Sequence, residues 1–150
     1  MTPTVQFTVL GTPTPQGSKT RMPNGAMVEG SSATQRAARA DWRSSVAAGA
    51  RIAADHFGCL EGPLRLELTF RFAMPKSRKA AIRGSGWCWK TSAPDLDKLV
   101  RAVGDALKIG GLVRDDSLFV EIVASKEEVW ADWTGCVIRV EPLTRDEDLS

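Results

Sequence analysis

The sequence has few of the residues on which many catalytic and metal-binding sites depend. It contains one histidine, and its three cysteines, Cys59, Cys88 and Cys136, form no CxxC pair. This argues against histidine-based catalysis, a zinc site and a disulfide framework, and it favours a reducing compartment. No apolar run approaches the roughly 18–20 residues of a membrane helix, and the N-terminus shows no signal-peptide pattern. We therefore expect a cytoplasmic protein.

Length and charge give the next constraints. A chain of 150 residues suits a single domain, 1–150, built around one core. The net charge is only +2, but residues 1–114 hold 17 Lys or Arg and 8 Asp or Glu, whereas residues 115–150 hold 3 and 10. A basic body favours a polyanionic partner, and an unevenly charged but merely solvated surface is the alternative.

Hydrophobic periodicity predicts an α+β fold with the order β-α-β-α-β-β, a mixed sheet and helices packed on one face. Between the regular elements we expect a long loop at 11–30, a basic loop at 75–93, a turn around 127–132 and a polar tail at 145–150. The expected strands are 5–9, 64–72, 118–125 and 134–141, and the expected helices are 31–57 and 94–109.

The first expected helix has two different faces. A serine at 31 or 32 can cap its N-terminus, and Gly58 ends it. Arg36, Arg39 and Arg43 form a basic stripe, which is either a solvated face or a DNA contact. The predicted core stripe consists of Trp42, Val46, Ala50, Ala53 and Phe57.

Two acidic clusters stand out, Asp95 with Asp97 and Asp115 with Asp116, and an amphipathic helix joins them. Two like charges about 4 Å apart cost roughly 1 kcal/mol in water and about 4 kcal/mol near a protein surface. Carboxylates gathered at one point therefore indicate a cation or phosphate chemistry. The alternatives are that the first pair only caps the helix and that the second forms a polar turn.

The geometry limits how these clusters can meet. The helix between them spans about 20 Å at 1.5 Å per residue. The chain from Gly110 to Asp116 reaches at most about 20 Å. The clusters can therefore meet by a nearly straight return path or across a subunit interface. If they meet, oxygen-only ligands favour Mg²⁺, and Lys98 or Arg101 would neutralise charge on a reacting phosphate.

The stretch from Pro94 to Leu107 reads P-D-L-D-K-L-V-R-A-V-G-D-A-L, and the chain continues with G-L-V-R-D-D-S-L-F-V. Together with the loop P-T-P-Q-G-S-K-T-R at 13–21, this pattern resembles RusA-type Holliday junction resolvases of the phage-borne kind. The resemblance implies a dimeric, Mg²⁺-dependent endonuclease, with Mn²⁺ as a possible substitute ion, that makes paired nicks in four-way DNA junctions. By position, it implies catalytic roles for Asp95, Asp97, Lys98, Arg101 and Asp116, and metal ligation by Asp95, Asp97, Asp115 and Asp116.

Two positions depart from the family pattern. Arg101 stands where the family usually has a functional lysine, and Lys98 stands where it usually has asparagine. Arg101 keeps the positive charge, although arginine and lysine differ in reach and in proton transfer. Asp105 matches a recurring family aspartate, which helix packing alone can explain.

Basic residues outside the motif suggest where DNA would bind. Trp87 and Trp89 either stack on an unpaired base or form one core-facing side of a strand. Lysine and arginine side chains would contact phosphates and make affinity fall with salt. The candidate DNA-binding residues are Lys19, Arg21, Lys76, Arg78, Lys79, Arg83 and Lys90.

Three functions fit these patterns to different degrees. A structure-selective endonuclease active on branched DNA explains both acidic clusters and the basic body. A non-catalytic protein that binds branched DNA is the alternative, and the departures at Lys98 and Arg101 are compatible with it. A sugar-nucleotide transferase with a DxD motif normally needs a larger nucleotide-binding domain than this length allows.

Overall fold

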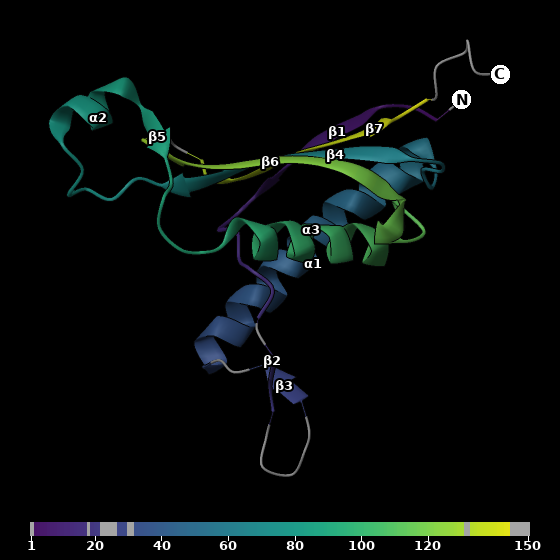
Figure 1. The fold of residues 1–150 in the computed structure, drawn as a ribbon, viewed down its shortest axis with the longest axis horizontal. Coiled ribbons are helices and arrows are strands. Elements are labelled where there is room, and N and C mark those ends of the chain that lie inside the picture. The colour runs from purple at the N-terminus through teal and green to yellow at the C-terminus, as the bar shows by residue number, and fades with distance from the viewer. Residues whose placement is uncertain (1, 18, 22–26, 30–31, 131–132, 145–150) are drawn as a thin grey trace.

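The computed structural model describes residues 2–17, 19–21, 27–29, 32–130 and 133–144. They form one α+β domain in two layers, in which two long helices cover one face of a mixed sheet (Figure 1). The predicted α+β class with a mixed sheet is therefore confirmed, whereas the chain contains more elements than the predicted order β-α-β-α-β-β. The polar tail predicted at 145–150 lies outside the described residues.

The structure has more elements than the sequence pattern predicts, because several of them are short. The strands are β1 (Val5–Leu10), β2 (Lys19–Arg21), β3 (Met27–Glu29), β4 (Leu64–Ala73), β5 (Trp87–Trp89), β6 (Phe119–Val129) and β7 (Gly135–Pro142). The helices are α1 (Ala33–Phe57), α2 (Ala80–Ser85), α3 (Leu96–Ile109) and the single 3₁₀ turn η1 (Asp116–Leu118).

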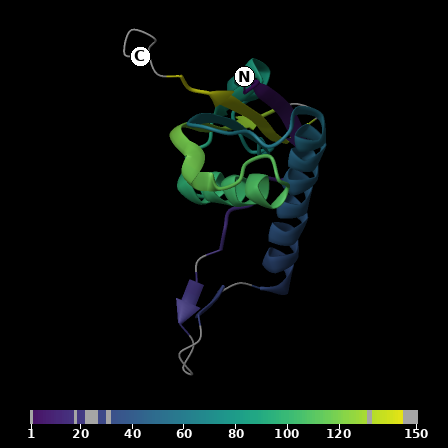
Figure 2. The ribbon, with the colours of Figure 1, turned by 90° about the vertical axis from the view of Figure 1, so that its right-hand side faces the viewer.

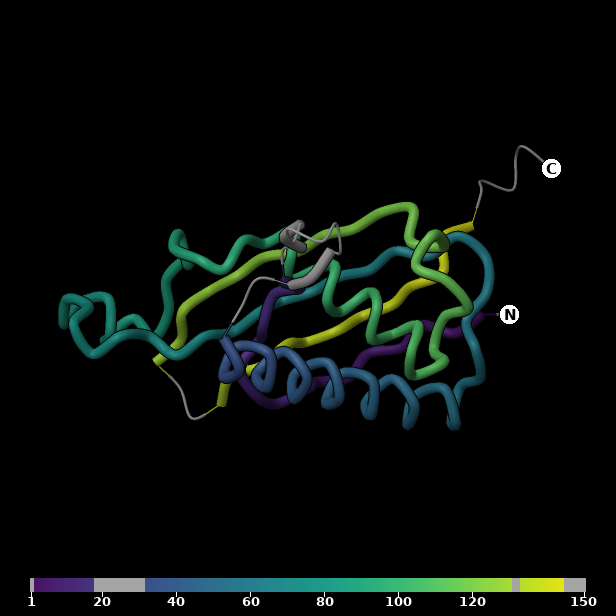
Figure 3. The backbone as a smooth tube through the Cα atoms, turned by 90° about the horizontal axis from the view of Figure 1, so that it is seen from below, coloured from purple at the N-terminus to yellow at the C-terminus, as the bar shows by residue number. Residues whose placement is uncertain are grey.

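The main sheet has the order β1-β7-β4-β6-β5, and β4 and β6 are its parallel pair. A parallel pair needs a long crossover connection, and the segment containing α3 supplies it. α1 follows β1 and lies beside α3 under the sheet, as the view from the helix side shows (Figure 3). β4 is therefore central, whereas β6 lies near one edge with α3 beneath it.

The two long helices form for identifiable local reasons. The Ser32 hydroxyl accepts a hydrogen bond from the Gln35 backbone amide, and the Gln35 side chain accepts one from the Ser32 amide, which makes a capping box. The predicted core stripe is buried from Trp42 to Ala53. Phe57 was predicted to join it but is exposed, because it is the last residue of α1.

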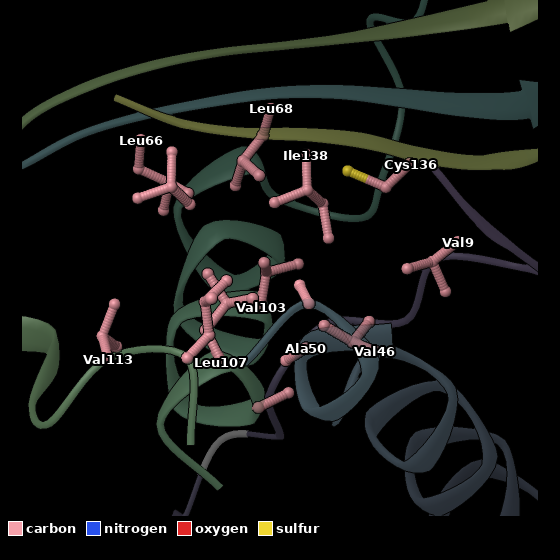
Figure 4. Packing of buried hydrophobic residues seen from close by; sticks show 14 of the residues in the cluster. Val9, Val46, Ala50, Leu66, Leu68, Val103, Leu107, Val113, Cys136 and Ile138 are labelled. Atoms are coloured by element: carbon pink, nitrogen blue, oxygen red, sulfur yellow. The ribbon is translucent and has the colours of Figure 1, made fainter. Parts of the chain in front are cut away.

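The core lies between the helices and the inner face of the sheet (Figure 4). Strand alternation directs one set of β4 side chains inward, which matches the strongest strand pattern in the sequence. The residues that meet there include Leu66, Leu68, Cys136 and Ile138 from the sheet, Val46 and Ala50 from α1, and Val103 and Leu107 from α3.

The outer face of the sheet carries charged side chains instead of helices. Arg65 lies 3.3 Å from carboxylate oxygens of Glu121 and Glu141 and 3.7 Å from Glu67. Arg139 bridges Glu67 and Glu141 from the neighbouring strand. Such exposed pairs add little stability, but they keep this face soluble without a covering layer.

The predicted loops contain regular structure. β2 and β3 pair as an antiparallel ribbon inside the segment 11–30, and this ribbon points away from the sheet on the helix side (Figure 2). α2 and β5 lie inside the basic loop 75–93. β6 runs to Val129, so the turn predicted to begin at 127 starts later. Among the described helices, none combines the length and apolar character needed to cross a membrane.

Candidate active site

The first acidic cluster lies where extended chain becomes helix α3. Asp95 is the N-cap residue with φ −67° and ψ 137°, and Asp97 lies in the first helical turn. The side chain of Asp95 makes no capping hydrogen bond, so helix capping does not explain this carboxylate. Both acids are exposed at the N-terminal end of α3, where the backbone amides of the first turn point outward.

Asp116 lies against the middle of α3 in the same protomer. A Cβ atom built on Gly104 would be 3.9 Å from the Asp116 Cβ, an ordinary van der Waals distance, so Asp116 packs beside this turn of the helix. Gly104 follows Asp97 by about 10 Å along the helix axis. The chain therefore returns only part of the way to the helix start, and neither a full straight path nor a second subunit is needed for Asp116 to reach α3.

Asp97, Arg101 and Asp116 line one cavity of about 240 Å³ between α3 and the edge of the sheet. A larger cavity of about 370 Å³ lies between α1 and the segment after β1, and Asp41 is the one acid among its described lining residues. Acids from both clusters and a cation thus share the smaller cavity. Its remaining walls are Leu66, Val100, Gly104, Phe119 and Ile122.

Asp115 points to different partners. Its carboxylate lies 3.0 Å from the Lys108 ammonium and accepts a hydrogen bond from the Ser117 amide at 3.2 Å. The bonds from Ser117 and Lys108 lower the pKa of Asp115 from 3.8 to about 2. The stabilisation from its ionised form is therefore present above about pH 4 and is lost as the pH falls toward 2. This explains Asp115 structurally as the cap of η1, and its role as a metal ligand stays a prediction.

Lys126 is a site residue that sequence analysis missed. Its ammonium donates hydrogen bonds to the carbonyl oxygens of Ser92, at 2.8 Å, and Pro94, at 2.6 Å. The side chain therefore ties β6 to the segment that immediately precedes Asp95. The available signal was its inward position on β6, opposite Phe70 of the core, where a lysine needs a specific partner.

The N-terminal loop also reaches α3. The Gln16 amide donates to the carbonyl of Lys98 at 3.1 Å, and the Gly11 amide donates to the carbonyl of Thr134 at 3.1 Å. The loop is thus fastened at both ends before it continues into β2. This places the ribbon that contains Lys19 and Arg21 on the α3 side of the molecule, although the orientation of those two side chains lies outside the description.

A second missed residue, Glu128, organises the basic segment, which is the loop 75–93 with α2 and β5 inside it. Glu128 is fully buried, and its carboxylate accepts hydrogen bonds from Arg78 at 2.8 Å and from the Cys88 thiol at 3.3 Å. Lys90 lies 3.8 Å away and also sits over the Phe72 ring at 5.0 Å. A buried carboxylate needs such partners, so Glu128 holds the two sides of the basic segment onto the sheet.

The other basic candidates have separate positions. Lys76 and Lys79 are exposed, and Arg83 lies over the Trp130 ring at 5.6 Å. In the helical basic stripe, Arg39 is nearly buried, so this stripe is not simply a solvated face. Trp87 and Trp89 are exposed, which excludes the alternative that they form a core-facing side of a strand.

Within the described ranges, no group of three or more His, Cys, Asp and Glu side chains lies close enough to enclose a metal ion. Mg²⁺ does not require such a cage, because it commonly keeps several waters and binds one or two carboxylates together with substrate phosphate. The shared cavity of Asp97 and Asp116 offers oxygen ligands of this kind. The residues therefore fit Mg²⁺ better than zinc.

The fold is a mixed sheet with two helices on its inner face. Its cavity between α3 and β6 combines two carboxylates with an arginine, a site suited to phosphate chemistry. The family model described as Endodeoxyribonuclease RusA matches residues 11–141. The chain belongs to the RusA endodeoxyribonuclease family, and the sequence-based resemblance is confirmed.

One curated relative also matches. It is a protein of Lactococcus phage r1t, named Crossover junction endodeoxyribonuclease rusA, and it is 36% identical over 64 residues. The match covers 43% of this chain and 44% of the relative. Less than half of each protein is thus compared, so this likeness supports the family and leaves activity and substrate to be argued from the site.

Proposed function

We propose that this protein is a Mg²⁺-dependent, structure-selective endonuclease that resolves four-way DNA junctions by paired nicks in recombination and repair. One observation carries the proposal. Asp97 and Asp116, which come from the two acidic clusters, line the same cavity as Arg101. Family membership supports phosphodiester hydrolysis as the reaction.

Asp97 and Asp116 would hold the ion. Asp95 does not line the cavity, and we propose that it adds a further oxygen ligand from the N-cap of α3, two residues before Asp97. Mg²⁺, when bound, polarises the phosphodiester and lowers the pKa of an attacking water, and Mn²⁺ can replace it. Arg101 would pair with the non-bridging phosphate oxygens and neutralise charge that develops on them. Because its guanidinium keeps its proton, Arg101 serves as an electrostatic partner and not as a proton donor.

The role of Lys98 needs a separate argument. Its backbone carbonyl holds Gln16, so the residue joins the N-terminal loop to the start of α3. Its side chain extends from the first helical turn, one residue after Asp97. We propose that Lys98 contacts a DNA phosphate next to the reacting one, in place of the family's asparagine.

We propose that DNA lies along β6, between the ribbon and the basic segment. Lys76 and Lys79 are exposed and suited to phosphate contacts, and we propose the same role for Lys19 and Arg21 of the ribbon. Arg78 and Lys90 would act together with Glu128, adding positive charge while they hold the segment in place. Binding should weaken steeply as salt rises, because each phosphate contact releases counterions. A cytoplasmic location stays a prediction.

A second copy of the chain is the proposed partner, and β6 provides the place for it. One edge of β6 pairs with β4. Among the described strands, the other edge pairs with β5 over Glu127–Val129 only, so it has no strand neighbour from Phe119 to Ser125. Val120, Ile122 and Val123 expose 64%, 48% and 53% of their surface there. Two-fold pairing of these edges would place two cavities beside one dimer interface, and paired nicking requires two such sites. Sedimentation equilibrium would test whether the protein is a dimer.

The test of the proposed function is cleavage of a synthetic four-way junction in Mg²⁺. We expect paired nicks in the junction and little cutting of linear duplexes with the same arm sequences. Chelation of the metal should stop cleavage, whereas Ca²⁺ should still allow binding. Binding without cleavage in Mg²⁺ or Mn²⁺ would contradict the proposal and favour the alternative, a non-catalytic protein that binds branched DNA.

Lys126→Met should impair the reaction more than DNA binding. The substitution removes both hydrogen bonds to the segment before Asp95 but keeps a long apolar side chain. Loss of an outer partner of a metal site typically costs about 10–100-fold, so we expect about tenfold slower cleavage and a higher Mg²⁺ concentration at half-maximal rate.

Lys79→Met is the matched control, because Lys79 is exposed in the basic segment. It should weaken junction binding in Ca²⁺ without moving the Mg²⁺ midpoint of cleavage. If Lys126→Met leaves that midpoint unchanged, Lys126 does not position the site.

A further inference from the structure

β5 carries two tryptophans outside the hydrophobic core. Trp87 exposes 45% and Trp89 exposes 60% of its surface. Tryptophan is highly buried on average, and adjacent exposed aromatic rings in a soluble protein indicate a binding surface. The cavity described above includes neither residue, so their exposure needs a separate explanation.

The strand register shows how the two rings are arranged. Trp87 lies opposite Val129, Cys88 opposite Glu128 and Trp89 opposite Glu127. Because the Cys88 thiol turns to buried Glu128, strand alternation places both tryptophans on the other, solvent-facing side. Their ring centroids are 4.8 Å apart and their planes meet at 88°, an edge-to-face pair.

The charges around this pair indicate its partner. The segment 76–90 contains five lysines and arginines and no acid. On β6, Glu127 adds one acceptor opposite Trp89. Cations combined with exposed aromatic rings are the combination that binds single-stranded nucleic acid, where phosphates meet the cations and bases stack on the rings. Arg78 and Lys90 are paired with Glu128 on the other side of β5, and Arg83 lies over Trp130. Exposed Lys76 and Lys79 are therefore the cations of this segment that are left to meet phosphates.

Several contacts hold the strand beneath the pair. Glu128 binds Cys88 between the two tryptophans and Arg78 from the segment before α2. The Lys90 amide, directly after β5, donates to the Lys126 carbonyl at 3.1 Å. Rings held in this way lose little freedom when a ligand stacks on them.

We propose that Trp87 and Trp89 form a stacking platform for an unpaired nucleobase, such as one freed at the branch point of a DNA junction. This proposal rests on the proposed function for its biological substrate. The platform itself recognises the base, whereas exposed Lys76 and Lys79 in the same segment recognise the backbone. Trp89, the more exposed ring, provides the larger stacking face.

The experiment compares two labelled single strands of equal length and charge, an oligothymidylate and the same backbone with abasic sites. Binding to the full chain is measured by fluorescence anisotropy in Ca²⁺, so that no cleavage occurs. We expect the wild-type protein to bind the strand with bases about tenfold more tightly. Trp89→Ala should bring the two affinities within about threefold, and Trp89→Phe should keep most of the preference because a ring remains.

Trp130→Ala is the matched control. Trp130 is exposed to the same 45%, but it follows Val129 and so alternates to the side of Glu128, where it contacts Arg83. This variant should keep the preference for bases. The proposal is overturned if the double variant Trp87→Ala, Trp89→Ala keeps it, or if Trp130→Ala alone removes it.

Junction cleavage in Mg²⁺, measured on the same wild-type preparation, separates this inference from the proposed function. Cleavage with no preference for bases would overturn the platform and support the nuclease. A preference that depends on Trp89, without any cleavage, would support the platform and overturn the nuclease.

Discussion

Asp97→Asn should reduce Mg²⁺-dependent junction cleavage by at least about a hundredfold, because even outer partners of metal ligands cost about 10–100-fold when removed. The amide keeps the size of the side chain but removes the negative charge that would hold the ion. Asp97 is exposed, so the fold should be unaffected. Initial rates on a four-way junction, with binding measured in Ca²⁺, separate the loss of catalysis from a loss of affinity.

The second acidic cluster supplies both a parallel test and a control. Asp116→Asn should lose as much activity as Asp97→Asn, because both carboxylates line the cavity. Asp115→Asn should lose far less, since this carboxylate is paired with Lys108 and caps η1. Full activity in Asp97→Asn would refute the assignment. A larger loss in Asp115→Asn than in Asp116→Asn would transfer the ligand role to Asp115.

The acidic residues of this site could be predicted from sequence because spacing reveals them. Asp95 and Asp97 straddle the start of a helix whose apolar stripe is unmistakable, and the motif continues to Asp116. The distinction between Asp115 and Asp116 could not be predicted. It depends on tertiary contacts, because Lys108 binds Asp115, whereas Asp116 lies beside Gly104 of α3 and lines the cavity.

Lys126 and Glu128 were missed for a related reason. Their partners are far away in sequence: Lys126 binds the carbonyls of Ser92 and Pro94, and Glu128 binds Arg78. In sequence they look like polar residues that end a strand, so the strand was predicted to stop near 125. In the structure the strand pairs with β4 as far as Val129, and buried Glu128 finds its partner Arg78 in the basic segment.

The long elements of the fold follow from periodicity, whereas the short ones depend on tertiary pairing. β4 alternates so regularly that either side of the sheet can be assigned from sequence. β5 has three residues and forms only because β6 offers it an edge. The ribbon of β2 and β3 likewise consists of two three-residue strands, too short for a periodic signal.

Gly110→Ala should destabilise the protein by about 1–3 kcal/mol, because it overpacks the contact between α1 and α3. Gly110 has φ −74°, which any residue can adopt, so its role is close approach and not backbone freedom. A Cβ there would lie 2.5 Å from the Ala47 carbonyl oxygen and 2.6 Å from the Ala50 Cβ. Because the first of these contacts is to backbone, the helices must separate to relieve it.

Thermal unfolding would measure this effect. For a protein of this size each kcal/mol corresponds to about 2–4 °C, so the Tm should fall by about 2–12 °C. Gly84→Ala is the matched control, since Gly84 lies in α2 with nothing within 4 Å of its added Cβ. Alanine is the better helix former by about 1 kcal/mol, so this variant should keep or slightly raise the Tm. Because α3 carries Asp97 and Arg101, Gly110→Ala should also slow cleavage below its Tm. An unchanged Tm would show that the two helices can separate at little cost.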